Sequence, residues 1–118
     1  MNLYLFCLSL NLSQPKITHS WFEQGTQSEF HAVHNHGPTG YSVVCFIDYD
    51  PKVHEPTFFC SPFNNFINGT VTEFQPKDIK EGDMIFFPST ILHHTKPSYS
   101  EIPRTVVSFN LDFQQMFR

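Results

Sequence analysis

The stretch YSVVCFIDY, residues 41–49, decides the fold class of this chain. Alternate side chains of a β-strand point to opposite faces of a sheet, and apolar residues here occupy both sets of alternate positions. A strand of this kind is covered on both faces, as a strand in the middle of a sandwich is. The stretch therefore predicts a layered core built from strands.

Short apolar stretches separated by turn signals lie on both sides of residues 41–49. The turn signals are HGPTG, DYDPKVHEP, NNFING, KEGD and KPSYSEIP. They predict strands at Leu3–Leu10, Ile17–Glu23, Ser28–His34, Tyr41–Tyr49, Thr57–Cys60, Thr70–Phe74, Asp83–Phe87, Ile91–Lys96 and Thr105–Phe113. One helical turn is expected in QPKDIKEGD. The pattern predicts an all-β double-stranded β-helix, a jelly-roll or cupin-like barrel, as a single domain over residues 1–118.

The composition supports this fold class and limits the function. The chain has 14 Phe and nine Pro, which favour strands and turns. A net charge of -4 with only seven Lys and Arg argues against general nucleic-acid binding. Cys7, Cys45 and Cys60 form no C-x-x-C motif and indicate reduced thiols. The opening MNLYLFCLSL lacks signal-peptide features, and no apolar run reaches the roughly 20 residues of a membrane span. We expect a cytoplasmic protein.

The stretch EFHAVHNH, residues 29–36, contains three of the seven histidines. Strand alternation puts His34 and His36 on the face of Phe30, and His31 on the other face. If the face of Phe30 is the core, two imidazoles point inward together, and burying them without partners is costly. A shared metal ion is one solution. Hydrogen bonds to backbone and water in a turn-rich loop are the alternative.

A third inward histidine is predicted from ILHHTK, residues 91–96. His94 shares a face with Lys96, which favours solvent, so His93 is the inward candidate. The preceding EGDMIFFP indicates a tight turn and a buried strand that ends at Pro88. An H-x-H pair and a histidine 57 residues after His36, each at a strand end, predict three ligands from non-adjacent strands. Facial metal sites with open positions are built in this way.

Arg104 follows His93 by 11 residues. Its companions on one strand face include Ser108 and Asn110. An inward arginine needs an anion, and its planar guanidinium binds a carboxylate through two parallel hydrogen bonds. Beside three histidines, this residue predicts a co-substrate that carries a carboxylate. The alternative is an arginine that is exposed or paired with Glu101 or another acid.

Together these stretches resemble the 2-oxoglutarate and Fe(II)-dependent oxygenases, and most closely a small bacterial and phage branch of that superfamily. The matching pieces are Trp21, Gly25, HNHGP, YSVVCF, EGDMIFFPSTILHHTKP and RTVVSFN. The similarity covers residues 21–110, and the spacing from FPS to His93 and the ending R-x-x-x-x-FN are its most specific parts. The resemblance implies a hydroxylase-type enzyme that uses Fe(II), the co-substrate 2-oxoglutarate and O2.

The resemblance also implies a role for each matching residue. His34, His36 and His93 fall on the metal-ligand positions, although the family usually has Asp or Glu where His36 lies. Arg104 falls on the residue that binds the distal carboxylate of 2-oxoglutarate. The family's hydroxyl two residues later is Val106 here, and Ser108 on the same face takes its place.

Several departures from the family pattern concern charge and length. A histidine at position 36 raises the charge of the site by one unit and weakens Fe(II) binding, and a dianionic co-substrate would balance that charge. Asp48, 12 residues after His36, is expected too far away to replace the carboxylate. The chain is short beside typical members, so we expect an N-terminally short domain. Four aromatic residues are interpreted either as a wall around the metal or as ordinary core: Phe30, Phe46, Phe86 and Phe87.

Two other functional classes fit the same stretches. GDMIFFPSTILH also matches a cupin pattern, so a three-histidine metal dioxygenase that does not use 2-oxoglutarate is one alternative, with Arg104 holding a substrate carboxylate. A non-catalytic jelly-roll binding module is the other, and the joint spacing of His34, His36, His93 and Arg104 opposes it. Substrate specificity is expected from the loops DYDPKVHEP and SPFNNFING, whose sequences do not identify a ligand.

Overall fold

The computed structural model describes residues 12–115, and every regular element in this range is a β-strand. The eight strands are β1 (Leu12–Gly25), β2 (His31–His34), β3 (Tyr41–Asp48), β4 (Phe58–Asn64), β5 (Val71–Phe74), β6 (Met84–Pro88), β7 (His93–Thr95) and β8 (Arg104–Gln115). Within residues 12–115 there is no helix with the length and apolar character needed to cross a membrane.

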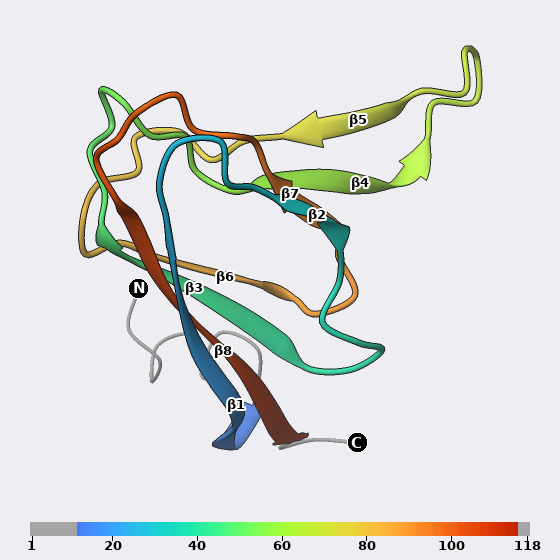
Figure 1. The fold of residues 1–118 in the computed structure, drawn as a ribbon. Helices are drawn as coiled ribbons and strands as arrows, with labels where there is room; N and C mark the ends of the chain where they lie inside the picture. Colours follow the sequence, from blue (N-terminus) through green and yellow to red (C-terminus); the bar gives the residue numbers. More distant parts are fainter. Residues whose placement is uncertain (1–11, 116–118) are drawn as a thin grey trace.

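The strands form two four-stranded sheets, with the orders β1-β8-β3-β6 and β2-β7-β4-β5. All the strand pairs are antiparallel. In Figure 1 the first sheet lies in the lower part of the molecule and the second in the upper part, with long connections at one side. The predicted all-β double-stranded β-helix is confirmed.

The core lies between the two sheets and is built from alternate residues of facing strands. Val44 and Phe46 of β3, Val106 of β8 and Phe87 of β6 meet Phe59 of β4, and each is no more than 8% exposed. The opposite face of the first sheet is also apolar, since its cross-strand partners include Phe22, Val107, Cys45 and Met84. Apolar residues on both faces of β3 agree with the pattern of residues 41–49.

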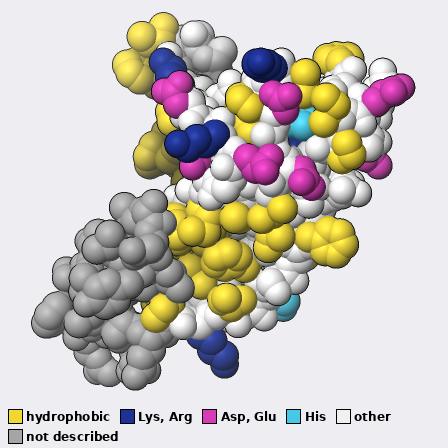
Figure 2. Space-filling model, turned by 90° about the vertical axis from the view of Figure 1, so that its left-hand side faces the viewer, with side chains coloured by type: hydrophobic (Ala, Val, Ile, Leu, Met, Phe, Trp, Pro, Cys, Tyr) yellow, Lys and Arg dark blue, Asp and Glu magenta, His cyan; other side chains and the backbone are white. Residues whose placement is uncertain are grey.

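Apolar side chains also gather in the middle of one face of the molecule, below a region that carries both acidic and basic groups (Figure 2). The exposed residues include Phe22, with 74% of its surface accessible, and Ile47, with 42%. This face of the molecule therefore has an apolar area beside a charged one.

Most predicted strands are present, with shifted ends. The strand predicted at Ser28–His34 begins only at His31, because the chain turns at Thr26–Glu29 and Ser28 has a positive φ of 71°. The helical turn expected in QPKDIKEGD is wrong, since this stretch consists of bends and a turn before β6. The strand predicted at Leu3–Leu10 lies outside the described residues.

Gly40 fixes the turn that leads from β2 into β3. Its φ is +82°, and a Cβ atom on it would lie 2.5 Å from the backbone oxygen of Leu111 in β8. Its own carbonyl oxygen accepts a hydrogen bond from the amide of Ser89. This position therefore requires glycine both for its conformation and for the space available.

The variant Gly40→Ala is expected to lower the free energy of unfolding by about 3 kcal/mol, since it adds a steric contact to a strained backbone. Gly37→Ala is the matched control, because Gly37 also has a positive φ, of +117°, but has open space where its Cβ would be. The free energy of unfolding of the control should fall by only about 1–2 kcal/mol. Chemical denaturation measures both values, and equal losses would contradict the steric role of Leu111.

Candidate metal centre

His34 and His93 lie directly opposite each other in neighbouring strands. They are cross-strand partners in the β2–β7 pair, and their ring centroids are 4.4 Å apart. Side chains at such positions start from Cβ atoms about 5 Å apart, so the two rings meet without further distortion. The prediction that the ligands come from non-adjacent strands is wrong for this pair, since β2 and β7 are distant in sequence but adjacent in the sheet.

His36 completes the cluster from the loop that follows β2. Its backbone amide donates a hydrogen bond of 2.9 Å to the carbonyl oxygen of Ser89, which holds the loop beside the turn between β6 and β7. Its ring centroid lies 4.8 Å from that of His93 and 5.4 Å from that of His34. One nitrogen of each ring lies within 4.8 Å of the others, so His34, His36 and His93 can hold a metal ion.

Each of the three rings has a hydrogen-bond partner at Nδ1. For His34 and His93 the acceptor is the carbonyl oxygen two residues earlier in the chain, at 2.7 and 3.0 Å. For His36 it is Oδ1 of Asn110, at 3.0 Å. A carbonyl oxygen only accepts, so Nδ1 carries the proton and Nε2 keeps its lone pair. These hydrogen bonds are of the kind that orient metal-ligating histidines, and they satisfy one side of each ring only.

Asn110 connects the cluster to a buried polar network. Its Oδ1 also accepts a hydrogen bond of 3.0 Å from Oγ of Ser42, and that hydroxyl lies 2.8 Å from Oγ of Ser89. Ser42 is completely buried and Ser89 is 2% exposed. Strand alternation predicted Asn110 on the same face as Arg104 and Ser108, but no role was predicted for it.

Aromatic side chains pack against two of the three histidines, His36 and His93. The ring of Trp21 lies 5.1 Å from His36, and those of Phe87 and Phe59 lie 4.9 and 5.9 Å from His93. Of the four aromatic residues interpreted as a wall, only Phe87 is there. Phe46 belongs to the core, Phe86 lies on the opposite face of β6 from Phe87, and Phe30 is 61% exposed.

Burial favours the neutral form of two of the three rings, His93 and His36. His93 is 4% exposed, and desolvation lowers its pKa to about 4 against a weaker opposing effect of its hydrogen bond to Ile91. Desolvation also lowers the pKa of His36, and the hydrogen bond to Asn110 opposes this effect. Neutral imidazole is the form that binds metal ions, so these two rings are ready to coordinate at neutral pH.

Arg104, at the start of β8, is a half-buried cation with an unused donor. Its Nε donates a hydrogen bond of 3.2 Å to the carbonyl oxygen of Glu55, and its guanidinium carbon lies 5.3 Å from the centre of the Phe46 ring. Nη2 is buried without a hydrogen-bond partner. Burial lowers the pKa of this group, and nearby Tyr49 and Glu23 oppose that effect.

No carboxylate within residues 12–115 forms an ion pair with Arg104, so the alternative pairing with Glu101 is not present. A buried guanidinium with a free N–H fits an anionic ligand, because an unpaired buried charge is costly.

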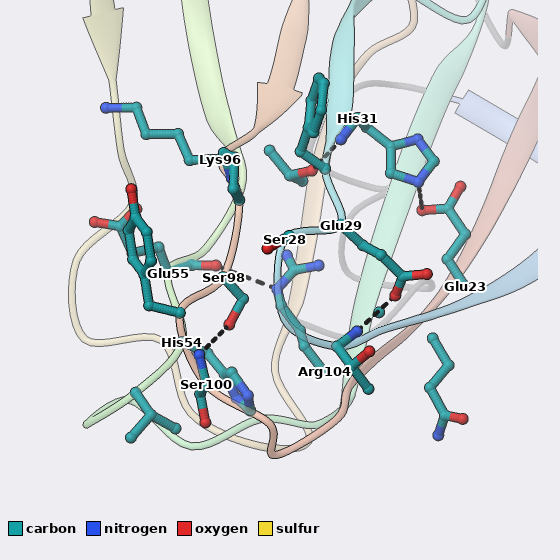
Figure 3. Close-up of a pocket in the computed structure, with 18 residues that line it drawn as sticks. Glu23, Ser28, Glu29, His31, His54, Glu55, Lys96, Ser98, Ser100 and Arg104 are labelled. Carbon is teal, nitrogen blue, oxygen red and sulfur yellow. Dashed lines mark hydrogen bonds and ion pairs between the residues drawn. The ribbon is translucent and has the colours of Figure 1, made fainter.

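A cavity of about 30 Å³ lies among the three histidines, Arg104 and Ser108. Ser108 is 4% exposed. Beside this cavity is an open groove of about 960 Å³, and Glu23, His31, Thr95 and Arg104 line both spaces. Figure 3 shows Arg104 extending among the residues of the groove. Of the two loops expected to set specificity, residues 53–55 line the groove, whereas residues 61–69 form the end of the β4–β5 hairpin.

Glu23 and His31 lie at the boundary between the cavity and the groove. Their side chains form an ion pair of 3.2 Å, and they are 34% and 47% exposed. Nε1 of Trp21 donates a hydrogen bond of 3.0 Å to Glu23. His31 is exposed as predicted. Glu23 was not predicted as a site residue, although it shares a strand face with Trp21 and Gly25 of β1, which was the available signal.

His54 has a structural role. It is 5% exposed; its Nδ1 accepts the amide of Asp50 at 2.9 Å, and its Nε2 donates to the carbonyl oxygen of Ile102 at 2.8 Å. Both nitrogens are therefore satisfied by backbone groups. Asp48 lies at the far end of β3, opposite Thr105, away from the histidine cluster, as expected.

Two antiparallel sheets with a candidate metal centre between them define a cupin-like, double-stranded β-helix protein. The chain belongs to the family described as "Putative 2OG-Fe(II) oxygenase", which matches residues 19–110. None of the curated proteins matches it.

Solved structures share this fold at low sequence identity. An oxidoreductase of the 2OG-Fe(II) oxygenase family from Burkholderia pseudomallei matches 86% of this chain with a TM-score of 0.64 and 14% identity. A prolyl-4-hydroxylase from Pseudomonas putida matches 91% with a TM-score of 0.58 and 15% identity. The matches cover 47% and 57% of those two chains, so the present chain spans about half their length.

The metal-free protein is expected to lose stability as the pH falls from 6.5 to 4. His93 titrates near 6.5 when unfolded and at about 4 when folded, so the unfolded state binds more protons in this window. The contribution of the neutral His93 ring to the free energy of unfolding is complete above pH 6.5 and is lost as the pH falls towards 4. In urea denaturation, His93→Gln should reduce this dependence, whereas His19→Gln, at an exposed position, should not. An unchanged pH slope in His93→Gln would contradict the burial of a neutral ring.

Proposed function

We propose that the protein is an Fe(II)- and 2-oxoglutarate-dependent oxygenase of the hydroxylase type, with His34, His36 and His93 as the metal ligands. One observation carries the proposal: three imidazoles converge with Nδ1 hydrogen-bonded and Nε2 left for a metal. The buried Nη2 of Arg104, which has no partner, adjoins the same cavity. Membership of the oxygenase family supports this assignment.

The ligand set is neutral, because a histidine occupies the position usually held by a carboxylate. Three imidazoles leave the charge of Fe(II) uncompensated, which lowers affinity for the free ion. The hydrogen bond from His36 to Asn110 partly offsets this loss, since an oxygen acceptor at Nδ1 raises the basicity of Nε2. The site is therefore expected to bind iron more tightly when an anionic ligand is present.

Arg104 is proposed to bind the distal carboxylate of 2-oxoglutarate, and Ser108 to assist it. Nη2 of Arg104 has no other partner, and the Ser108 side chain lines the same cavity. The cavity of about 30 Å³ has room for about two water molecules, so the co-substrate needs additional space. Turning aside Glu23 and His31 would join the cavity to the groove, and an exposed ion pair of this kind contributes only about 0–1 kcal/mol.

Bound Fe(II) and 2-oxoglutarate would supply the chemistry that activates O2 to oxidise a C–H bond of the substrate. The chain itself orients the ligands and excludes water. Trp21, Phe59 and Phe87 pack against His36 and His93 and reduce the access of water to the metal position. The groove beside Arg104 is proposed to hold the substrate, and its acidic and basic side chains fit a polar molecule.

Anaerobic titration tests the co-substrate site. The wild-type protein is expected to bind Fe(II) and to show a visible charge-transfer band when 2-oxoglutarate is added. Arg104→Gln should keep the iron but weaken 2-oxoglutarate binding about 10- to 100-fold, since a charged hydrogen bond to the carboxylate is lost. Lys52→Gln, which removes a positive charge from an exposed loop, is the control. It should change neither the affinity for Fe(II) nor the affinity for 2-oxoglutarate.

The other outcomes separate the alternatives. Iron binding without the band would favour a three-histidine dioxygenase that uses no 2-oxoglutarate. A protein that binds no iron in either condition would be a non-catalytic binding module. Formation of succinate from 2-oxoglutarate by the iron-loaded protein measures the activity directly.

Asn110 is expected to act as a positioning residue for the metal centre. Asn110→Ala removes the acceptor for Nδ1–H of His36 and should weaken Fe(II) binding about 10- to 100-fold. Asn110→Asp keeps an oxygen at this position and should recover most of the affinity. Competition with a chelator measures both constants. If the two variants bind iron equally, the hydrogen bond to His36 does not orient the ligand.

A further inference from the structure

A second cluster of metal-ligating side chains lies on the opposite face of the sheet β2-β7-β4-β5. It consists of Cys60 in β4, Glu73 in β5 and His94 in β7. Cys60 and Glu73 are cross-strand partners, and His94 pairs with Phe58, which shares a strand face with Cys60. Three neighbouring strands therefore each present one donor atom on the face that points away from His93.

The three donor atoms are already close together. The sulfur of Cys60, a carboxylate oxygen of Glu73 and a ring nitrogen of His94 all lie within 4.8 Å of one another. Tetrahedral Zn²⁺ has bonds of about 2.0–2.3 Å, which separate its ligands by about 3.5 Å. Small rotations of the exposed Glu73 side chain and of the Cys60 side chain bring the atoms to that distance.

The imidazole of His94 is held in place by its surroundings. Its side chain is 12% exposed, and Nε2 lies 2.8 Å from Oε1 of Glu73. Its ring is stacked on Phe58 with centroids 5.2 Å apart and an interplanar angle of 13°. An ion pair between Glu73 and His94 accounts for two members of the cluster, but it gives no role to the thiol of Cys60.

The donor types select one class of cation. A thiolate, an imidazole and a carboxylate suit Zn²⁺, whereas Ca²⁺ and Mg²⁺ prefer oxygen ligands alone. One thiolate and one carboxylate balance the two charges of Zn²⁺. The occupied site would thus carry no net charge beside Lys96, whose Nζ lies 4.1 Å from the centre of the Phe58 ring.

We propose that Cys60, Glu73 and His94 form a second metal site, for a zinc-type divalent cation with one coordination position open to solvent. This site goes beyond the proposed oxygenase function and shares no residue with the histidine cluster. It would connect β7, β4 and β5. Of these, β5 is an edge strand whose four residues are all exposed, at the base of the hairpin that projects from the molecule in Figure 1.

Binding of Co²⁺ to the full chain tests the proposal, because only a thiolate ligand gives a strong charge-transfer band in the near ultraviolet. The wild type is expected to bind two Co²⁺ ions and to show this band. Cys60→Ser should bind one ion and lose the band. The matched control is Cys45→Ser, which removes the other partly buried thiol of the described residues. This variant should keep the charge-transfer band.

Two further variants separate this site from the histidine cluster. Glu73→Gln should weaken Zn²⁺ binding at least about tenfold while Fe(II) binding at the other site is unchanged. His34→Ala should remove the ion without sulfur ligation and leave the thiolate band. Failure of the oxygenase function would therefore not affect the outcome at Cys60.

A second readout concerns the hairpin. Zn²⁺ should slow amide hydrogen exchange in residues 58–64 and 71–74 of the wild type and not of Cys60→Ser. The proposal is overturned if the thiolate band is absent from the wild type, if it persists in Cys60→Ser, or if Zn²⁺ leaves exchange in these strands unchanged.

Discussion

The pairing of His34 with His93 across β2 and β7 is the constraint on which the candidate metal centre depends. Two residues at directly opposite positions of an antiparallel pair have no freedom to separate while the strands stay paired. The third ring is added by the loop from His36 to Gly40, which the turn before β7 holds through hydrogen bonds from backbone to backbone. The sheet and this loop therefore bring the three nitrogens together before any metal is bound, and metal binding need not supply the cost of ordering them.

β8 connects this centre to the rest of the site. It lies between β1 and β3, and its inward residues alternate from Arg104 through Val106 and Ser108 to Asn110. Arg104, at the start of the strand, carries the unpaired Nη2, and Asn110, six residues later, supplies the acceptor for His36. Because both belong to one rigid strand in the middle of a sheet, the distance between the arginine and the histidine cluster is fixed by the fold and not by a loop.

Local sequence predicted the features that depend on alternation along one strand. It assigned His93 inward and His94 outward, and the structure places these two rings on opposite faces of β7. It could not predict which strands are neighbours, so the adjacency of β2 and β7 was missed. The partner of His36 lies 74 residues away in sequence, and no local pattern identifies it.

The same limit explains why Phe30 was wrongly expected in the aromatic wall. Phe30 precedes the first residue of β2, and β2 is an edge strand. The alternation of apolar residues in the sequence therefore no longer predicts which side chains are buried there. The aromatic ring on His36 comes instead from Trp21 in the other sheet.

Charge balance links the proposed iron site to Arg104. Three neutral imidazoles leave a bound divalent ion with its full charge, and Arg104 adds a second positive centre whose buried Nη2 has no partner. A ligand with one anionic group would compensate one centre and leave the other uncompensated in a medium of low dielectric constant, which is costly. A ligand with an anionic group at each end compensates both at once and also replaces the missing ligand carboxylate. The loss of the usual acid at position 36 therefore makes the proposed site more dependent on a dicarboxylate such as 2-oxoglutarate, and iron and co-substrate should each increase the affinity for the other.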